Sequence, residues 1–235
     1  MLKLETVSQI TDETLAYWKQ EVNKPTFVEI AQGKEIGHKL ADMVDEKTTT
    51  LLTVNHITKS QRDYQGKKRS RSMGDLWLLD DGIYHALNVK TGVVGAEGQP
   101  NLVSMKKLLL GIVQRQIDSY YLLYVKMAII SGAIAPSVYF FDMLDWLDYA
   151  TFDSGPGQIM LKAKPFFTHY KPKSIQDRNI KKKVTRLLAL YEDGERRLRE
   201  NRALDFIKYK QSVSDFLGST DWTVTPETQW SLQLQ

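Results

Sequence analysis

GDLWLLDDGIYHALNVKTG, residues 74–92, is the stretch that decides the fold. Two short apolar runs flank Asp81 and Gly82, a pair typical of two-residue type I′ turns, in which both central residues have positive φ. The sequence therefore predicts an antiparallel hairpin of two strands. With Asp81 and Gly82 as its loop, the register sets Asp75 directly across from Asn88, at the open end of the hairpin.

The open end of this hairpin is expected to gather polar side chains. Side chains alternate along a strand, so Asn88 and Lys90 share one face while Leu87 and Val89 share the other. Lys90 also lies on the diagonal from Asp75. A carboxylate, a side-chain carbonyl and an ammonium group are therefore predicted to lie close together. The opposite face of the hairpin is predicted to pack in the core.

This combination of groups suits the hydrolysis of a phosphate ester. Oxygen ligands from Asp and Asn suit Mg²⁺, which keeps several waters and takes few protein ligands. A nearby Lys can orient a metal-bound water and stabilise charge on a phosphate. The alternative is a half-exposed hairpin whose polar face is simply hydrated, because an Asp followed after twelve residues by Asn-x-Lys occurs by chance in many proteins.

The context of the hairpin resembles a known family. An Asp followed after twelve residues by Asn-x-Lys-Thr resembles the PD-(D/E)xK nuclease motif, in which an Asp and an (Asp/Glu)-x-Lys lie on adjacent strands. The downstream NVKT and QPNLVSMKKL are similar to the HincII-type branch of type II restriction endonucleases, where Asp-Val-Lys-Thr is followed by a Pro-Asn that begins a helix. The resemblance is clearest over residues 75–118 and weaker over the helix around Glu35 and over the strands to about residue 170.

The resemblance implies roles for the matching positions only. Asp75 takes the place of the metal-binding Asp, and Asn88 takes the place of the second acidic metal ligand. Val89 would offer its backbone carbonyl to the metal, and Lys90 takes the place of the catalytic Lys. Glu35 lies where such enzymes often carry a helical carboxylate, and a solvated helix residue is the alternative for it. Mg²⁺ is the implied cofactor, with no further small-molecule cofactor.

Two positions depart from the family pattern. Gly74 replaces the Pro of the motif name, where these enzymes vary. Asn88 brings a carbonyl oxygen but no negative charge, so we expect weaker metal binding than an Asp would give. Asn88 is either a natural variant or an Asp→Asn substitution that weakens cleavage. On this basis, Asn88→Asp is expected to tighten metal binding and raise the cleavage rate.

Basic residues near the motif indicate contact with DNA. A run of four positive charges comes just before Asp75, where it would neutralise backbone phosphates, and a solvated linker is its alternative. Gln99 and Asn101 match the region that meets DNA bases and the minor groove in the HincII-type enzymes. Residues 173–210 carry 12 Lys or Arg against 6 Asp or Glu, which fits either a phosphate-facing patch or a solvated helix surface. The run before Asp75 consists of Lys67, Lys68, Arg69 and Arg71.

Composition excludes several other classes of function. The chain has 235 residues, a net charge of +4 and no cysteine, so disulfides, thiolate chemistry and Cys-bound zinc are excluded. Its four histidines lie far apart, without metal-ligand spacing. The N-terminus has no signal-peptide pattern, and Lys126, Gly132 and Pro136 interrupt the longest apolar stretch, which is therefore better interpreted as two buried strands. We expect a cytoplasmic protein without a membrane partner.

The pattern along the chain predicts one α/β (α+β) domain over residues 1–235. We expect N-terminal helices over 9–47, a catalytic core over about 48–170, and basic C-terminal helices over about 174–217, broken at 193–194. Within the core, a strand is expected over 48–58 and an Asn-capped helix from about Asn101 to 118. The predicted architecture is a mixed central β-sheet flanked by helices, similar to the restriction-endonuclease core.

These observations predict a Mg²⁺-dependent, sequence-specific endonuclease for double-stranded DNA, acting as a homodimer. A two-fold dimer would bring one active site to each strand of a palindromic site. The rival hypothesis is a DNA-binding protein with the nuclease fold and weak or no catalysis, because Asn88 lowers the charge of the ligand set. A third possibility is an unrelated α/β protein whose hairpin matches by accident.

Overall fold

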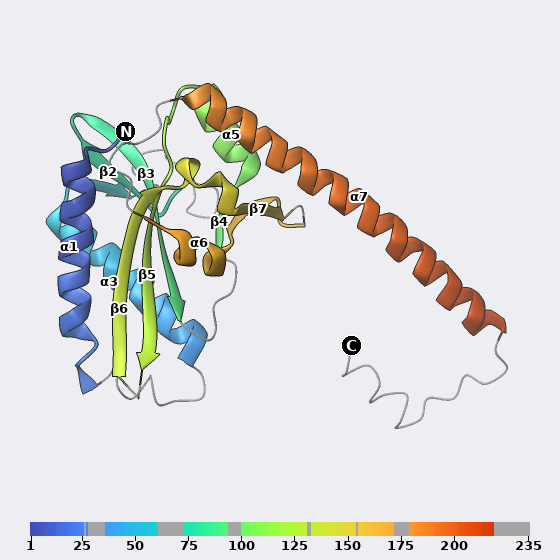
Figure 1. Ribbon diagram of the computed structural model, residues 1–235, viewed down its shortest axis with the longest axis horizontal. Coiled ribbons are helices and arrows are strands. Elements are labelled where there is room, and N and C mark those ends of the chain that lie inside the picture. The colour runs from blue at the N-terminus through green and yellow to red at the C-terminus, as the bar shows by residue number, and fades with distance from the viewer. Residues whose placement is uncertain are drawn as a thin grey trace. The chain divides into compact units, whose positions relative to one another are not determined.

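A mixed five-stranded sheet forms the centre of the computed structural model (Figure 1). The strand order is β1-β2-β3-β5-β6; β3 and β5 run parallel, and the other neighbours are antiparallel. The strands are β1 Thr58–Ser60, β2 Leu76–Asp80, β3 Ile83–Val93, β5 Tyr121–Ile130 and β6 Ala133–Asp142. The structure describes residues 1–25, 27, 36–60, 73–93, 100–130, 133–153, 155–171 and 179–218. The predicted fold class, a mixed sheet flanked by helices, is confirmed.

The hairpin of β2 and β3 has the predicted turn and the predicted register. Asp81 and Gly82 have φ angles of 51° and 77°, as a type I′ turn requires. Asp80 pairs with Ile83, and the pairing continues in step to the pair of Leu76 with Leu87. The turn therefore determines which side chains of β3 face each side of the sheet.

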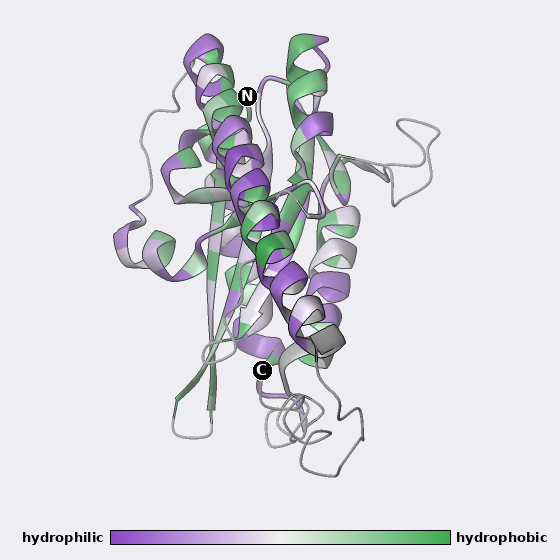
Figure 2. Cartoon of the chain, turned by 90° about the vertical axis from the view of Figure 1, so that its right-hand side faces the viewer, coloured by the Kyte–Doolittle hydropathy of each residue, from purple (hydrophilic) through white to green (hydrophobic). Residues whose placement is uncertain are grey.

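Two helices cover one face of this sheet. The helix α1 (Leu4–Glu21) contributes Ile10, and α3 (Ile36–Asn55) contributes Leu52, to a core that also holds Leu87 and Val89 of β3. The two helices are joined by a buried hydrogen bond in which Trp18 Nε1 donates to Thr48 Oγ1 at 3.0 Å. Both the apolar contacts and this bond fix α3 across β3. Figure 2 shows hydrophobic and hydrophilic residues alternating along the helices, as expected for helices with one buried face.

The strand predicted over residues 48–58 is wrong, because α3 continues through this segment to Asn55. Thr49, Thr50 and Thr53 each donate their hydroxyl to the carbonyl four residues earlier, which satisfies these side chains inside a helix. Burial of Leu52 against the sheet outweighs the β propensity of Thr and Val. Only Thr58–Ser60 form a strand here.

The opposite face of the sheet carries the second layer of the protein. This layer consists of a three-stranded sheet in the order β4-β8-β7, two short helices and the first part of α7. Trp77 of β2, Leu122 of β5 and Phe166 of α6 are fully buried in the core between these layers. The elements are β4 Asn101–Ser104, α5 Met105–Val113, η2 Met143–Asp145, η3 Leu147–Tyr149, β7 Ala150–Asp153, β8 Gln158–Leu161, α6 Ala163–His169 and α7 Ile180–Gly218.

The Asn-capped helix predicted from Asn101 is also wrong at its start. Asn101 is an exposed residue at the beginning of β4, where it pairs with Met160 of β8. The helix α5 begins only at Met105, after Ser104. Residues 101–104 form a strand because they pair with β8. This partner strand is distant in sequence, so the local sequence around Asn101 does not indicate the pairing.

The helix α7 shows no break at 193–194. Gly194 lies inside the helix. Glycine suits this position because the backbone approaches Phe152 so closely that a Cβ atom would stand 2.3 Å from Phe152 Cδ1. The chain divides into two units, Met1–Gly194 and Glu195–Gln235, and the first unit holds every candidate site residue that the structure describes. None of the helices in the described ranges combines the length and the apolar character needed to cross a membrane.

A buried ion pair attaches the start of α7 to the core. Lys183 Nζ donates to Asp142 Oδ2 at 2.9 Å and also pairs with Asp145, and all three side chains are buried. Asp142 Oδ1 in turn accepts hydrogen bonds from the backbone N–H groups of Tyr120 and Leu144. The carboxylates are thus held by a cation and by backbone donors, which offsets the cost of burying them.

Lys183→Met should therefore lower the free energy of unfolding by about 3 kcal/mol or more, because it leaves two buried carboxylates without their cation. Urea unfolding of this variant beside Lys181→Met, which alters an exposed lysine of the same helix, measures the effect. Equal stability of the two variants would show that the buried pair does not anchor α7.

Candidate metal and phosphate site at the open end of the hairpin

The candidate site lies where β2 ends and β3 continues. Pairing between the two strands stops at Leu76 and Leu87, whereas β3 runs on to Val93 along β5. Among the described residues, no strand pairs with this last part of β3 on the side away from β5. Asp75 stands at this point, so its side chain reaches the exposed flank of β3.

Asp75 is held against β3 by two hydrogen bonds. Its backbone N–H donates to Leu87 O at 2.8 Å, and its carboxylate Oδ2 accepts from Val89 N at 3.1 Å. Asp75 therefore bonds to the residues on either side of Asn88, rather than pairing with Asn88 in the ladder. The Lys90 ammonium lies 4.0 Å from Asp75 Oδ2, and the two side chains are 26% and 29% exposed. The structure thus brings Asp75 and Lys90 together as the register predicts.

Val89 presents its backbone to the same place. The N–H and C=O of one strand residue point to the same side of the strand. Since the Val89 N–H donates to the Asp75 carboxylate, the Val89 carbonyl oxygen also faces the Asp75 side of β3. The Val89 side chain is buried on the other face, in the core beneath α1 and α3.

Asn88 is the most constrained member of the group. The residue is 4% exposed, and its Nδ2 donates to Leu102 O at 2.7 Å and to the Tyr120 hydroxyl at 3.0 Å. A backbone carbonyl can only accept, so the nitrogen of the amide must face Leu102. The amide oxygen Oδ1 points elsewhere, and it is buried without a hydrogen-bond partner in the described part of the chain.

Tyr120 connects the Asn88 amide to the charge of Asp75. Its hydroxyl accepts from Asn88 Nδ2 and donates to Leu102 O at 3.2 Å. Burial raises the pKa of the Tyr120 phenol, and the negative charge of Asp75 raises it further. Asp75 therefore lies close enough to act on a group that touches the Asn88 amide, and Tyr120 stays neutral.

Asp45 of α3 is a member of this group that the sequence did not reveal. Thr91 Oγ1 donates to Asp45 Oδ1 at 2.6 Å, which ties the helix to β3 one residue beyond Lys90. Burial raises the pKa of Asp45 to about 6; the charge of Asp75 acts in the same direction, while Thr91 and Lys90 oppose it. No spacing motif relates Asp45 to the hairpin, because the contact depends on how α3 crosses β3.

The group offers oxygen ligands of the kind that Mg²⁺ prefers. It provides two carboxylates, from Asp75 and Asp45, together with the Val89 carbonyl that faces Asp75 and the unpaired amide oxygen of Asn88. The unpaired Asn88 Oδ1 fits this interpretation, because a buried acceptor without a partner is costly unless an ion or a water satisfies it. Within the described residues, however, no group of three or more Asp, Glu or His side chains is placed to hold a metal.

The remaining predicted residues are only partly described. Glu35, the basic run and Gln99 lie outside the described residues. Asn101 is exposed and precedes Leu102, whose carbonyl accepts from Asn88, so it borders the site. In the C-terminal basic segment, Lys183 is buried and cannot face a phosphate, and Arg186 pairs with Asp148. The basic run is Lys67, Lys68, Arg69 and Arg71.

Comparisons with known proteins assign the chain to no family. No protein-family model matches the sequence. The search of curated proteins likewise finds no match. The function is therefore inferred from the residues of the site and from the way in which the fold positions them.

Asn88→Asp is expected to destabilise the protein in EDTA by about 1–3 kcal/mol, because a carboxylate oxygen would replace the amide donor that faces Leu102 O. Mg²⁺ should restore part of this loss, because the added carboxylate would strengthen Mg²⁺ binding to the folded state, and an ion that binds only the folded state stabilises it. Thermal unfolding with and without Mg²⁺ measures both effects. A variant as stable as the wild type in EDTA would contradict the observed orientation of the amide.

Asp45 should make stability fall as pH rises from about 4 to about 7 in EDTA. Its folded-state pKa of about 6 is above the ordinary value of 3.8, so the folded state holds a proton that the unfolded state releases. The contribution of Asp45 to the free energy of unfolding is therefore complete below about pH 4 and is lost as the pH rises through about 6. It amounts to at most about 3 kcal/mol.

Asp45→Asn should remove this part of the pH dependence and keep the acceptor for Thr91. Asp12→Asn, which alters an exposed carboxylate of α1, is the matched control and should leave the profile unchanged. Chemical unfolding at several pH values compares the three proteins. Parallel profiles for wild type and Asp45→Asn would show that Asp45 titrates normally.

Proposed function

We propose that this protein is a Mg²⁺-dependent endonuclease that hydrolyses phosphodiester bonds in double-stranded DNA, acting as a homodimer in the cytoplasm. The observation that carries the proposal is the buried, unpaired Asn88 Oδ1, on the face of β3 that also carries Lys90, whose ammonium group pairs with Asp75. A buried acceptor without a partner, on a strand whose same face carries a half-buried ammonium group paired with a carboxylate, fits a site that is completed by a ligand.

In the proposed site, Asp75, Asn88 and Val89 would hold the ion through their oxygens. Bound Mg²⁺ supplies a Lewis acid for a phosphoryl oxygen and lowers the pKa of a bound water. The Lys90 ammonium, next to Asp75, orients the attacking water and offsets negative charge on the phosphoryl oxygens. Asp45, with a pKa of about 6, can take up a proton near neutral pH at the oxygen that does not bind Thr91.

The resemblance to PD-(D/E)xK nucleases supports this assignment at Asp75, Val89 and Lys90. At Asn88 the bonding favours an amide that is native to the site, because both of its donor positions have acceptors. Asp45 would then contribute the second negative charge that position 88 lacks. We infer a site whose two carboxylates come from the end of the hairpin and from α3.

A DNA-binding protein with weak or no cleavage is the second candidate function. The neutral Asn88 favours it, because Mg²⁺ binds less tightly to an amide than to a carboxylate. In that case the group around Asp75 would contact a phosphate without activating water. Binding and cleavage must therefore be measured separately.

Lys90→Ala should reduce plasmid cleavage by at least about a hundredfold, because it removes a group that acts on the reacting phosphate, while DNA binding stays within about tenfold. The assay uses a mixed-sequence plasmid with Mg²⁺, and Lys19→Ala on α1 is the matched control. Asp75→Asn should also abolish cleavage and weaken the stabilisation by Mg²⁺.

The outcomes separate the candidates. Cleavage by Lys90→Ala at the wild-type rate would remove Lys90 from the mechanism. A wild-type protein that binds duplex DNA but never cuts it, over a titration of Mg²⁺ and Mn²⁺, would support the DNA-binding candidate. A protein that neither binds nor cuts DNA would overturn both.

A further inference from the structure

The helix α6 and its flanking residues carry three exposed lysines and no carboxylate of their own. Between Gln158 and Lys171 the chain has Lys162, Lys164 and Lys171 and no Asp or Glu. All three lysines are exposed, and none has an ion-pair partner among the described residues. We call these three lysines the α6 basic surface.

Several other lysines of the described chain have carboxylate partners. Lys24 and Lys47 both pair with Glu21, and Lys183 pairs with two buried aspartates. Lys3 pairs with Asp81 at the hairpin turn. Three exposed lysines that are close in sequence and have no ion-pair partner among the described residues attract anions, so an anionic partner is the natural complement of the α6 basic surface.

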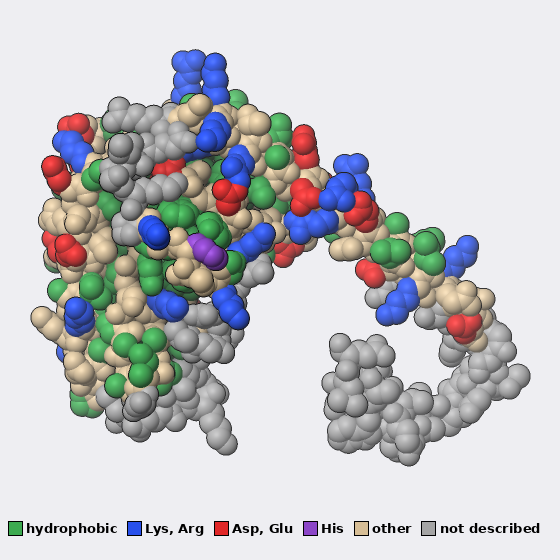
Figure 3. Space-filling model, viewed as in Figure 1, with side chains coloured by type: hydrophobic (Ala, Val, Ile, Leu, Met, Phe, Trp, Pro, Cys, Tyr) green, Lys and Arg blue, Asp and Glu red, His purple; other side chains and the backbone are tan. Residues whose placement is uncertain are grey.

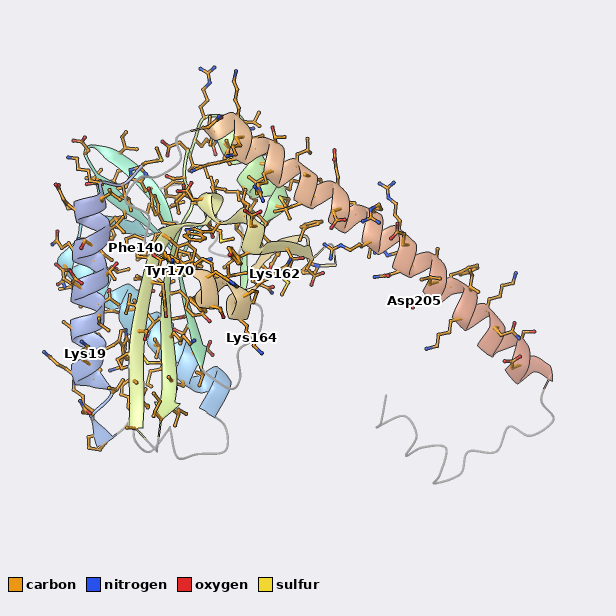
Figure 4. All side chains as sticks on the ribbon, viewed as in Figure 1. Lys19, Phe140, Lys162, Lys164, Tyr170 and Asp205 are labelled. Carbon is orange, nitrogen blue, oxygen red and sulfur yellow. The ribbon has the colours of Figure 1, made fainter. Side chains whose placement is uncertain are left out.

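This surface borders the candidate site. Lys90 of β3 pairs with Tyr124 of β5 in the parallel ladder, and the Tyr124 ring lies 4.6 Å from the ring of Phe167 on α6. Lys126, two residues further along β5, places its ammonium 5.2 Å from the same Phe167 ring. The helix α6 therefore lies over the face of the sheet that carries Lys90. Figure 4 labels Lys162 and Lys164 beside α6, with Lys19 on α1.

The helix presents its lysines from a rigid base. Phe166 is fully buried, and its ring lies 4.5 Å from that of Phe141 and 5.3 Å from that of Trp146. Tyr170 packs on Tyr139 of β6 at 5.3 Å. Figure 3 shows Lys and Arg side chains gathered around α6 on this face of the molecule. A surface fixed in this way can contact a rigid polyanion at several points with little loss of entropy.

We propose that the α6 basic surface binds the DNA backbone beside the phosphate that is cleaved. The inference rests on the proposed function, because its ligand is the same duplex. Lysine ammonium groups on an exposed helix contact phosphates as point charges, so this surface adds affinity that is independent of base sequence. It lies apart from the predicted basic run, whose residues are outside the described chain.

The test measures binding to a duplex oligonucleotide of about 30 base pairs by fluorescence anisotropy, in EDTA, over a range of salt concentrations. The variant Lys162→Gln/Lys164→Gln/Lys171→Gln should bind at least about tenfold more weakly, and the slope of log K against log salt should fall by roughly 2–3, since each phosphate contact contributes about 0.9. The variant with Arg at the same three positions should keep the wild-type slope.

Lys19→Gln is the matched control for a single charge. Lys19 is exposed on α1, which covers the other face of the sheet, whereas Lys164→Gln alters one charge of the α6 basic surface. Lys164→Gln should lower the slope by about 0.9 and Lys19→Gln should not change it. Thermal unfolding of each variant checks that the fold is retained.

The outcomes distinguish this inference from the proposed function. If the wild type cuts DNA and the triple Gln variant keeps its affinity and salt slope, the α6 basic surface does not contact DNA, while the nuclease proposal stands. Loss of affinity in the Arg variant as well would overturn a role based on charge. A wild type that binds no duplex DNA would overturn the inference together with the proposed function.

Discussion

The pairing of β2 with β3 is the constraint on which the rest of the structure depends. Because side chains alternate along a strand, a slip of one residue would turn Leu87 and Val89 out of the core beneath α1 and α3 and bury Lys90 in their place. The turn at Asp81-Gly82 favours one register locally, and the apolar residues on both faces enforce it. The same register brings Asp75 to Val89 and Lys90, so the fold and the site are fixed by one interaction.

Two buried polar residues, Lys183 and Asn88, differ in how completely their polar atoms are paired. Lys183 is buried with its charge matched by Asp142 and Asp145, and Asp142 also accepts backbone hydrogen bonds from Tyr120 and Leu144. Asn88 is equally buried, but only its nitrogen is satisfied; its oxygen has no partner among the described residues. A buried acceptor of this kind is costly unless a water, an ion or a ligand satisfies it. The contrast within one core is the reason to assign the second position, and not the first, to chemistry.

The sequence predicted what local chemistry determines. The hairpin, its register and the shared face of Asn88 and Lys90 follow from turn residues and the two-residue period of strands. The errors fall where a distant partner decides: the core holds residues 48–55 in a helix, β8 draws Asn101 into a strand, and Phe152 accommodates Gly194 inside α7. The sequence did not predict Asp45 as a site residue for the same reason. Its place beside Thr91 depends on the crossing of α3 over β3, which neither residue spacing nor composition encodes.

The charge of the site explains how a neutral Asn88 could serve in the proposed function. Two carboxylates face one ammonium group, so the protein alone offers a divalent ion only a modest electrostatic attraction. A DNA phosphate bound beside Lys90 would add both an oxygen ligand and a negative charge. Metal and DNA would then bind more tightly together than separately, and by linkage each would raise the affinity of the other by the same factor. Such a site would favour Mg²⁺ binding when DNA is present, and the α6 basic surface would hold the backbone close enough to complete it.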